Sequence, residues 1–78
     1  DGNQCFWINH GPVVKNLREL KDALGRVDDD KFDYHAKGEN NDFSVWIDVV
    51  LGEPKLAKKL KRLKTRRGFI KALEKQLP

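Results

Sequence analysis

The chain has 78 residues, of which 38% are hydrophobic and 36% charged, and its formal net charge is +4 at pH 7. This composition argues against a disordered chain, and no apolar run approaches the roughly 18 residues that a membrane span requires. The single cysteine, Cys5, excludes an intrachain disulfide and a zinc site built on paired thiolates. We expect one small domain over residues 1–78 and, since no charged-then-apolar leader opens the sequence, a cytoplasmic location.

The segment from about residue 5 to 15 has the pattern of a β-hairpin. Two short runs of aromatic and β-branched residues flank a turn at Asn9-His10-Gly11, whose glycine can take a positive φ. Phe6 and Trp7 are neighbours on the first strand, so their side chains point to opposite faces. One ring should therefore be half exposed, and Trp7 is the candidate for an aromatic contact with a ligand.

Residues 16–77 have the pattern of a helical bundle. Asn16 with Glu19 forms a capping box for a first helix, and the acidic run Asp28–Asp30 caps a short second one. The inward positions of the first helix repeat at helical spacing: Leu17, Leu20, Leu24 and Val27. The second helix carries Phe32, Tyr34 and His35.

A third helix is expected from about Asp42 to Leu51. Its apolar stripe is complete: Phe43, Trp46, Ile47, Val50 and Leu51. Val45 and Val49 widen this stripe, so we expect the helix to be the most buried in the domain. Gly52 should end it.

Two further helices complete the chain. Pro54 suits the first turn of the fourth helix, and Thr65 caps the fifth. The inward side chains are Leu56, Leu60 and Leu63 in one, and Phe69, Ile70, Leu73 and Leu77 in the other. The predicted fold class is mostly α (α+β), with a short N-terminal β-hairpin packed on a compact bundle of about five short helices.

Charge is distributed unevenly between the two parts of the chain. Residues 1–54 hold six Lys or Arg and eleven Asp or Glu, whereas residues 55–78 hold ten and one. The candidate anion-binding residues are Lys55, Lys58, Lys59, Lys61, Arg62, Lys64, Arg66 and Arg67. If six to eight of them met DNA phosphates, log K would fall with log salt at a slope of about −5 to −7. The alternative is a hydrated surface that offsets the acidic half, with salt bridges to Asp28–Asp30.

Catalytic and metal-binding interpretations have weaker support. Cys5 could be paired with His10 or His35 as a dyad, but an inert structural thiol is far commoner. Neither histidine has the spacing of a metal ligand, and no phosphate-binding glycine loop is present. We expect no catalytic residue, no metal and no cofactor.

One stretch resembles a known family. The residues that carry the resemblance are His35, Asn41-Asp42-Phe43, Trp46-Ile47, Val50-Leu51-Gly52 and Leu56-Ala57. They are similar to an uncharacterised small domain common in archaeal proteins, and the similarity extends over about residues 12–77. The resemblance implies an accessory or binding module. In physical terms, Asn41 or Asp42 caps the third helix and His35 hydrogen-bonds that cap.

These observations favour a non-catalytic module that binds DNA, RNA or another polyanion through its last two helices. A protein partner, contacted through the hairpin aromatics and the acidic surface, is the alternative. In that case the chain is an accessory domain of a larger protein, as the start at Asp1 without a methionine suggests. Peripheral attachment to anionic lipid is the weakest option, because the fourth helix has no aromatic residue at its polar boundary.

Overall fold

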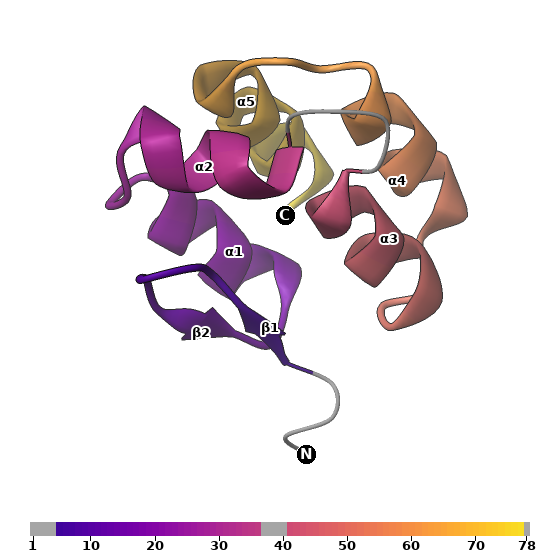
Figure 1. Ribbon diagram of the computed structural model, residues 1–78. Helices are drawn as coiled ribbons and strands as arrows, with labels where there is room; N and C mark the ends of the chain where they lie inside the picture. The colour runs from indigo at the N-terminus through magenta and orange to yellow at the C-terminus, as the bar shows by residue number, and fades with distance from the viewer. Residues whose placement is uncertain (1–4, 37–40, 78) are drawn as a thin grey trace.

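A two-stranded hairpin and five helices make up the described part of the chain, residues 5–36 and 41–77 of the computed structural model (Figure 1). The elements are β1 (Phe6–Trp7), β2 (Val13–Val14), α1 (Leu17–Leu24), α2 (Asp29–Ala36), α3 (Asp42–Val49), α4 (Pro54–Lys61) and α5 (Arg66–Gln76). The predicted fold class is therefore confirmed.

The hairpin is antiparallel, with Phe6 opposite Val14 and Trp7 opposite Val13. In its turn, the residue with positive φ is His10, at 56°, and not Gly11. Gly11 is required for a different reason: a Cβ at this position would lie 2.9 Å from Cγ2 of Ile8. The glycine thus permits a close approach between the turn and a buried side chain.

Side-chain caps begin α1, α2, α3 and α5, as the sequence predicts, and at α2 the Asp28 carboxylate accepts the backbone N–H of Lys31 at 3.0 Å. The Asn16 carboxamide oxygen accepts the backbone N–H of Glu19 at 2.8 Å, and the Glu19 carboxylate accepts that of Lys15. Asn41 caps α3 and Thr65 caps α5 in the same way. Each cap satisfies one of the N–H groups that have no partner within the helix.

Stacked and edge-on aromatic rings form the centre of the core. Phe32, Phe43 and Phe69 come from α2, α3 and α5, and their ring centroids lie 5.0–5.7 Å apart. Phe6 adds a fourth ring from the hairpin, 4.9 Å from Phe43. Because these rings come from four elements, burying them fixes the hairpin and three helices relative to one another.

Helix α3 departs from the predicted burial. Phe43, Trp46 and Ile47 are buried, but Val45 and Val49 are 54% and 74% exposed. The expectation that these two valines widen the buried stripe is wrong. The helix also ends at Val49, before the predicted Leu51. Its neighbours cover only one side of it, so a helix with apolar residues around most of its surface still exposes two of them.

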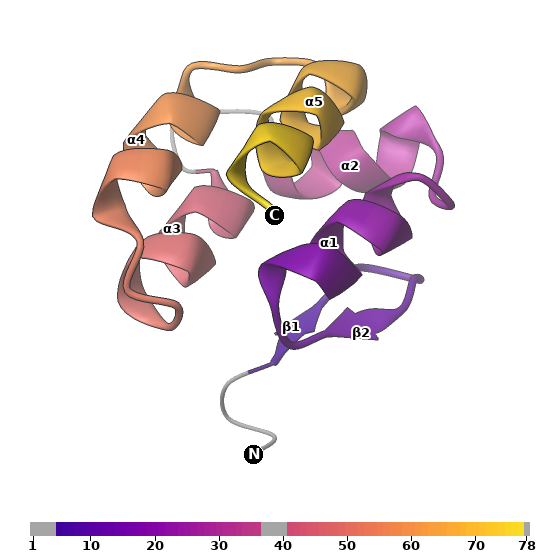
Figure 2. The same ribbon diagram turned by 180° about the vertical axis from the view of Figure 1, so that it is seen from behind.

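The helices pack as two pairs that α2 connects. Helices α3 and α4 lie side by side, and α1 packs against α5 (Figures 1 and 2). Helix α2 contacts both α3 and α5, and the hairpin lies against α1. This arrangement leaves the outer sides of α4 and the α4–α5 connection at the surface.

Candidate nucleic-acid interface

Helix α4 presents a dense row of lysines because its apolar residues all face inward. Leu56, Ala57 and Leu60 are buried against the rest of the bundle. Pro54 begins the helix at a position where its fixed φ is favourable and its missing N–H costs nothing. The four remaining residues of the helix are lysines, and every one of them is exposed.

These lysines divide between two faces of α4. Lys55, Lys58 and Lys59 surround one shallow hollow together with Arg62, which follows the helix. Lys61 lies beside α3 instead, where it lines a second hollow with Lys58. Within the described residues, none of these five cations lies within 4.0 Å of a carboxylate oxygen. The predicted basic block is thus unpaired on α4, but it does not form one continuous face.

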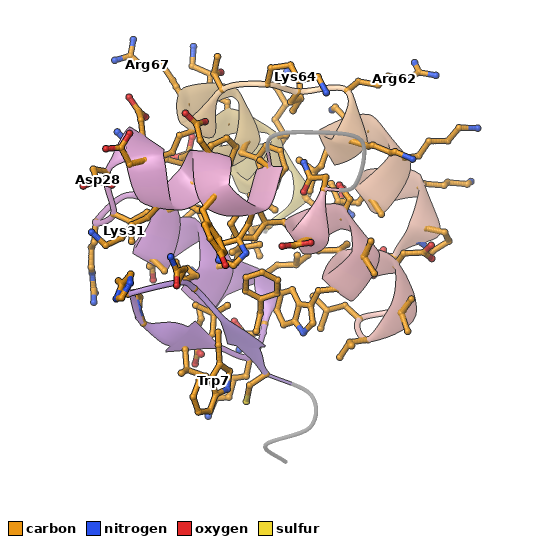
Figure 3. The ribbon with its side chains drawn as sticks, in the orientation of Figure 1. Trp7, Asp28, Lys31, Arg62, Lys64 and Arg67 are labelled. Carbon is orange, nitrogen blue, oxygen red and sulfur yellow. The ribbon has the colours of Figure 1, made fainter. Side chains whose placement is uncertain are left out.

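Beyond α4, exposed cations continue along one edge of the molecule. Figure 3 shows three of them along the upper edge of the view: Arg62 and Lys64 on the α4–α5 connection, and Arg67 in the first turn of α5. The side chains of Arg62 and Arg67 are directed outward. Arg67 borders a hollow that also contains Gly25 and Lys71, next to the end of α1. The predicted site residues therefore extend from α4 to the neighbourhood of α1.

Arg66 differs from the other predicted site residues because it is half-buried and paired. Its Nε donates to the Asp29 carboxylate at 3.0 Å, and its Nη1 donates to the Leu24 carbonyl oxygen at 2.8 Å. The Leu24 carbonyl is one of those at the end of α1 that have no partner within the helix. Arg66 thus joins α5 to α1 and α2, as in the salt-bridge alternative, although it also lines the hollow that Arg67 borders.

One residue of the acidic run Asp28–Asp30, which lies beside α5, is held in its charged form. Asp28 accepts the backbone N–H of Lys31 at 3.0 Å. This backbone hydrogen bond lowers the pKa of Asp28 from its ordinary value, with smaller contributions in the same direction from the charges of Lys31 and Arg66. The carboxylates of Asp28 and Asp29 therefore offset part of the positive charge where α5 begins.

Trp7 is exposed as expected but lies far from the cations. Its side chain is 73% exposed, whereas Phe6 on the opposite face packs against the core. In Figure 3, Trp7 lies at the end of the molecule opposite Arg62, Lys64 and Arg67. A ligand bound along α4 and the α4–α5 connection would therefore not stack on Trp7.

His35 has both ring nitrogens occupied by hydrogen bonds. Its Nε2 accepts the backbone N–H of Asn9 at 2.9 Å, so Nδ1 carries the proton and donates to the Asp42 carboxylate at 3.1 Å. The sequence predicts a hydrogen bond from His35 to the cap of α3; the structure shows its bond to Asp42, the first residue of the helix, while Asn41 is the cap. Because Nε2 accepts a main-chain N–H, it is not free to act as a general base or to bind a metal. Residues 5–36 and 41–77 contain no group of three or more His, Cys, Asp or Glu placed to hold a metal ion.

Sequence reasoning missed the polar row on α3. Asn41, Ser44 and Asp48 follow one another at helical spacing and line the same hollow as Lys58 and Lys61 of α4. The available signal was three polar residues at positions i, i+3 and i+7 in a helix that is otherwise largely apolar. Without knowledge of the helix that faces them, helix capping and contact with solvent explain such polar residues equally well.

Comparison with known proteins identifies a family whose function is unknown. Residues 3–77 match the model of a family described as a family of unknown function, DUF5752. No curated protein and no solved structure matches the chain. Among the described residues, none of the helices is long and apolar enough to cross a membrane.

Proposed function

The chain belongs to the family of unknown function DUF5752, and we propose that it is a non-catalytic, cytoplasmic module that binds nucleic acid or another polyanion through α4 and the connection that follows it. The observation that carries the proposal is the exposed set of Lys55, Lys58, Lys59 and Arg62. These three lysines of α4 and Arg62, which follows the helix, border one hollow, and no described carboxylate pairs with any of the four.

The chemistry of this face suits a phosphate backbone. Lysine ammonium groups on flexible stems bind phosphates as point charges, and Arg62 adds a planar group that donates two parallel hydrogen bonds. Such contacts hold a duplex or a single strand without distinguishing bases. Four phosphate contacts give a slope of log K against log salt of roughly −4, less steep than the full predicted set would give.

The proposal is tested by titrating a DNA duplex at about 50 and 200 mM salt, a range over which phosphate contacts weaken steeply. The unmodified chain should bind at low salt and lose affinity at high salt. The double variant Lys59→Glu/Arg62→Glu should lose binding at both, because it reverses two charges at exposed positions. A single-stranded RNA of the same length shows whether the surface distinguishes the two polymers.

The matched control is Lys15→Glu/Arg18→Glu, which makes the same change in net charge at two exposed positions near the start of α1. It should retain most of the affinity. Equal losses in the two double variants would show that net charge alone drives binding. Affinity that is absent, or that is insensitive to salt, would reject the proposal.

A protein partner is the second candidate function. The observation that favours it is the pair of exposed valines on α3, which with Phe6 and Trp46 border a shallow apolar groove. If the chain acts through such a partner, the DNA titration should show no salt-dependent binding. Binding of the protein partner should be lost in a Val45→Asp/Val49→Asp variant.

A further inference from the structure

A groove of about 310 Å³ lies between α3 and α4, on the face of α4 next to the one that carries Lys55 and Lys59, and Lys58 borders both faces. Small-molecule sites occupy roughly 300–1,000 Å³, so the groove has room for a small ligand. Among the described residues, its apolar lining consists of Val45, Pro54 and Ala57. Its polar lining consists of Asn41, Ser44, Asp48, Lys58 and Lys61.

Two polar atoms of this lining are buried without a hydrogen-bond partner. They are Nδ2 of Asn41 and Oγ of Ser44, in residues that are only 4% and 5% exposed. The orientation of the Asn41 amide is fixed, because its Oδ1 accepts the backbone N–H of Ser44 at 3.1 Å. Its NH₂ group is therefore the end left unsatisfied. Buried polar groups normally have partners, so two adjacent exceptions at one groove require an explanation.

The charged residues of the groove are close to one another but unpaired. Lys58 and Lys61 come from α4 and Asp48 from α3, yet no ammonium group lies within 4.0 Å of the carboxylate. The groove thus offers hydrogen-bond donors from four side chains and one carboxylate acceptor. A matching ligand has several acceptor oxygens, negative charge and at least one hydroxyl group.

We propose that this groove binds a phosphate monoester of a small hydroxylated molecule. The ammonium groups of Lys58 and Lys61 bind the phosphate oxygens, and the Ser44 hydroxyl and the Asn41 amide donate to them. The Asp48 carboxylate accepts a hydrogen bond from a ligand hydroxyl, and Val45 and Pro54 contact its carbon skeleton. Because these two unpartnered atoms are covered in the free chain, binding includes a displacement of the side chains that cover them, while the Asn41 amide keeps its cap hydrogen bond.

The same phosphate chemistry is available from two sources, a free small molecule and the 5′-phosphorylated end of a nucleic-acid strand. The inference does not depend on the proposed function, although Lys58 borders both surfaces. Lys59 and Arg62 are absent from the lining of the groove, while Asn41 and Ser44 are absent from the outer face of α4. Variants at these two pairs therefore separate the sites.

The test follows backbone amide signals by NMR while adenosine 5′-monophosphate is added at constant ionic strength. We expect saturable shifts at Ser44, Asp48, Lys58 and Lys61, and none with adenosine. Asn41→Asp preserves the cap oxygen but replaces the amide donor with a carboxylate, and Lys61→Gln changes an exposed side chain that the fold does not use. Each variant should weaken binding by about tenfold or more, whereas Lys59→Glu/Arg62→Glu should retain it while losing duplex DNA.

A second arm identifies the source of the phosphate. It compares a 5′-phosphorylated oligonucleotide with the 5′-hydroxyl form of the same sequence. A preference for the phosphorylated strand that Asn41→Asp and Lys61→Gln abolish supports phosphate binding in the groove. It does so even if adenosine 5′-monophosphate causes no shifts. The proposal is overturned if neither phosphate monoester shifts the groove signals at up to about 10 mM, a concentration above the millimolar Kd of weak complexes. It is also overturned if Lys61→Gln binds as tightly as the unmodified chain.

Discussion

At Arg66, one guanidinium group binds a carboxylate and a helix-terminal carbonyl at the same time. The Asp29 carboxylate is largely exposed, so its ion pair with Arg66 contributes little free energy. The hydrogen bond to the Leu24 carbonyl matters more, since it is charge-assisted and partly buried. A residue that appears in the sequence as part of a basic run therefore has a mainly structural role.

Replacing this residue separates the structural role from ligand binding. Arg66→Ala should lower the free energy of unfolding by about 1–2 kcal/mol, because it removes a charge-assisted hydrogen bond. Urea denaturation measures this loss. Affinity for duplex DNA should fall less than threefold, in contrast with Lys59→Glu/Arg62→Glu. A loss of binding as large as that of the double variant would place Arg66 in the interface.

At the scale of the element, α3 shows two unlike faces. Ile47 is fully buried in the core, whereas Val49, two residues later, is 74% exposed. Their Cα positions differ by about 200° around the helix axis, since successive residues are about 100° apart. Composition alone does not reveal this difference, because both residues are aliphatic and β-branched.

Alanine substitutions on the two faces of α3 should have very different effects. Ile47→Ala should lower the free energy of unfolding by about 2–5 kcal/mol, because it leaves a cavity in the core. Val49→Ala should change it by less than about 0.5 kcal/mol, as is usual at the surface. Urea midpoints of the two variants provide the comparison. Equal losses would indicate that another surface covers Val49 in solution.

At the scale of the whole molecule, His35 connects segments that are distant in sequence. It projects from α2, accepts an N–H from the hairpin turn at Asn9 and donates to Asp42 at the start of α3. Its ring also contacts Phe6 and Phe43 edge-on. The packing of the hairpin on the bundle therefore depends on one buried imidazole.

Removing this imidazole should destabilise the entire chain. His35→Ala leaves the Asn9 N–H without its acceptor and opens a cavity between aromatic rings, at a cost of about 2–4 kcal/mol. That is close to the total net stability of roughly 3–5 kcal/mol expected for a core of this size. Thermal unfolding followed by circular dichroism should show a low or absent transition. The control is Tyr34→Ala, which removes a neighbouring exposed ring and should unfold near the temperature of the unmodified chain.

The sequence by itself determined the local features of this protein. Caps such as Asn16, Asn41 and Thr65 act on N–H groups three residues away, and the spacing of leucines and phenylalanines assigns the inward face of most helices. The existence and order of the hairpin and helices therefore followed from the chain, as did the location of the exposed lysines on α4.

Only the tertiary structure decided which residues meet. The pairing of Arg66 with Leu24 joins positions 42 residues apart, and the exposure of Val49 depends on which sides of α3 its neighbours leave open. The groove that brings Ser44 opposite Lys58 likewise exists only once α3 and α4 lie side by side. Such contacts depend on the angles and distances between helices, which the periodicity of a single helix does not encode.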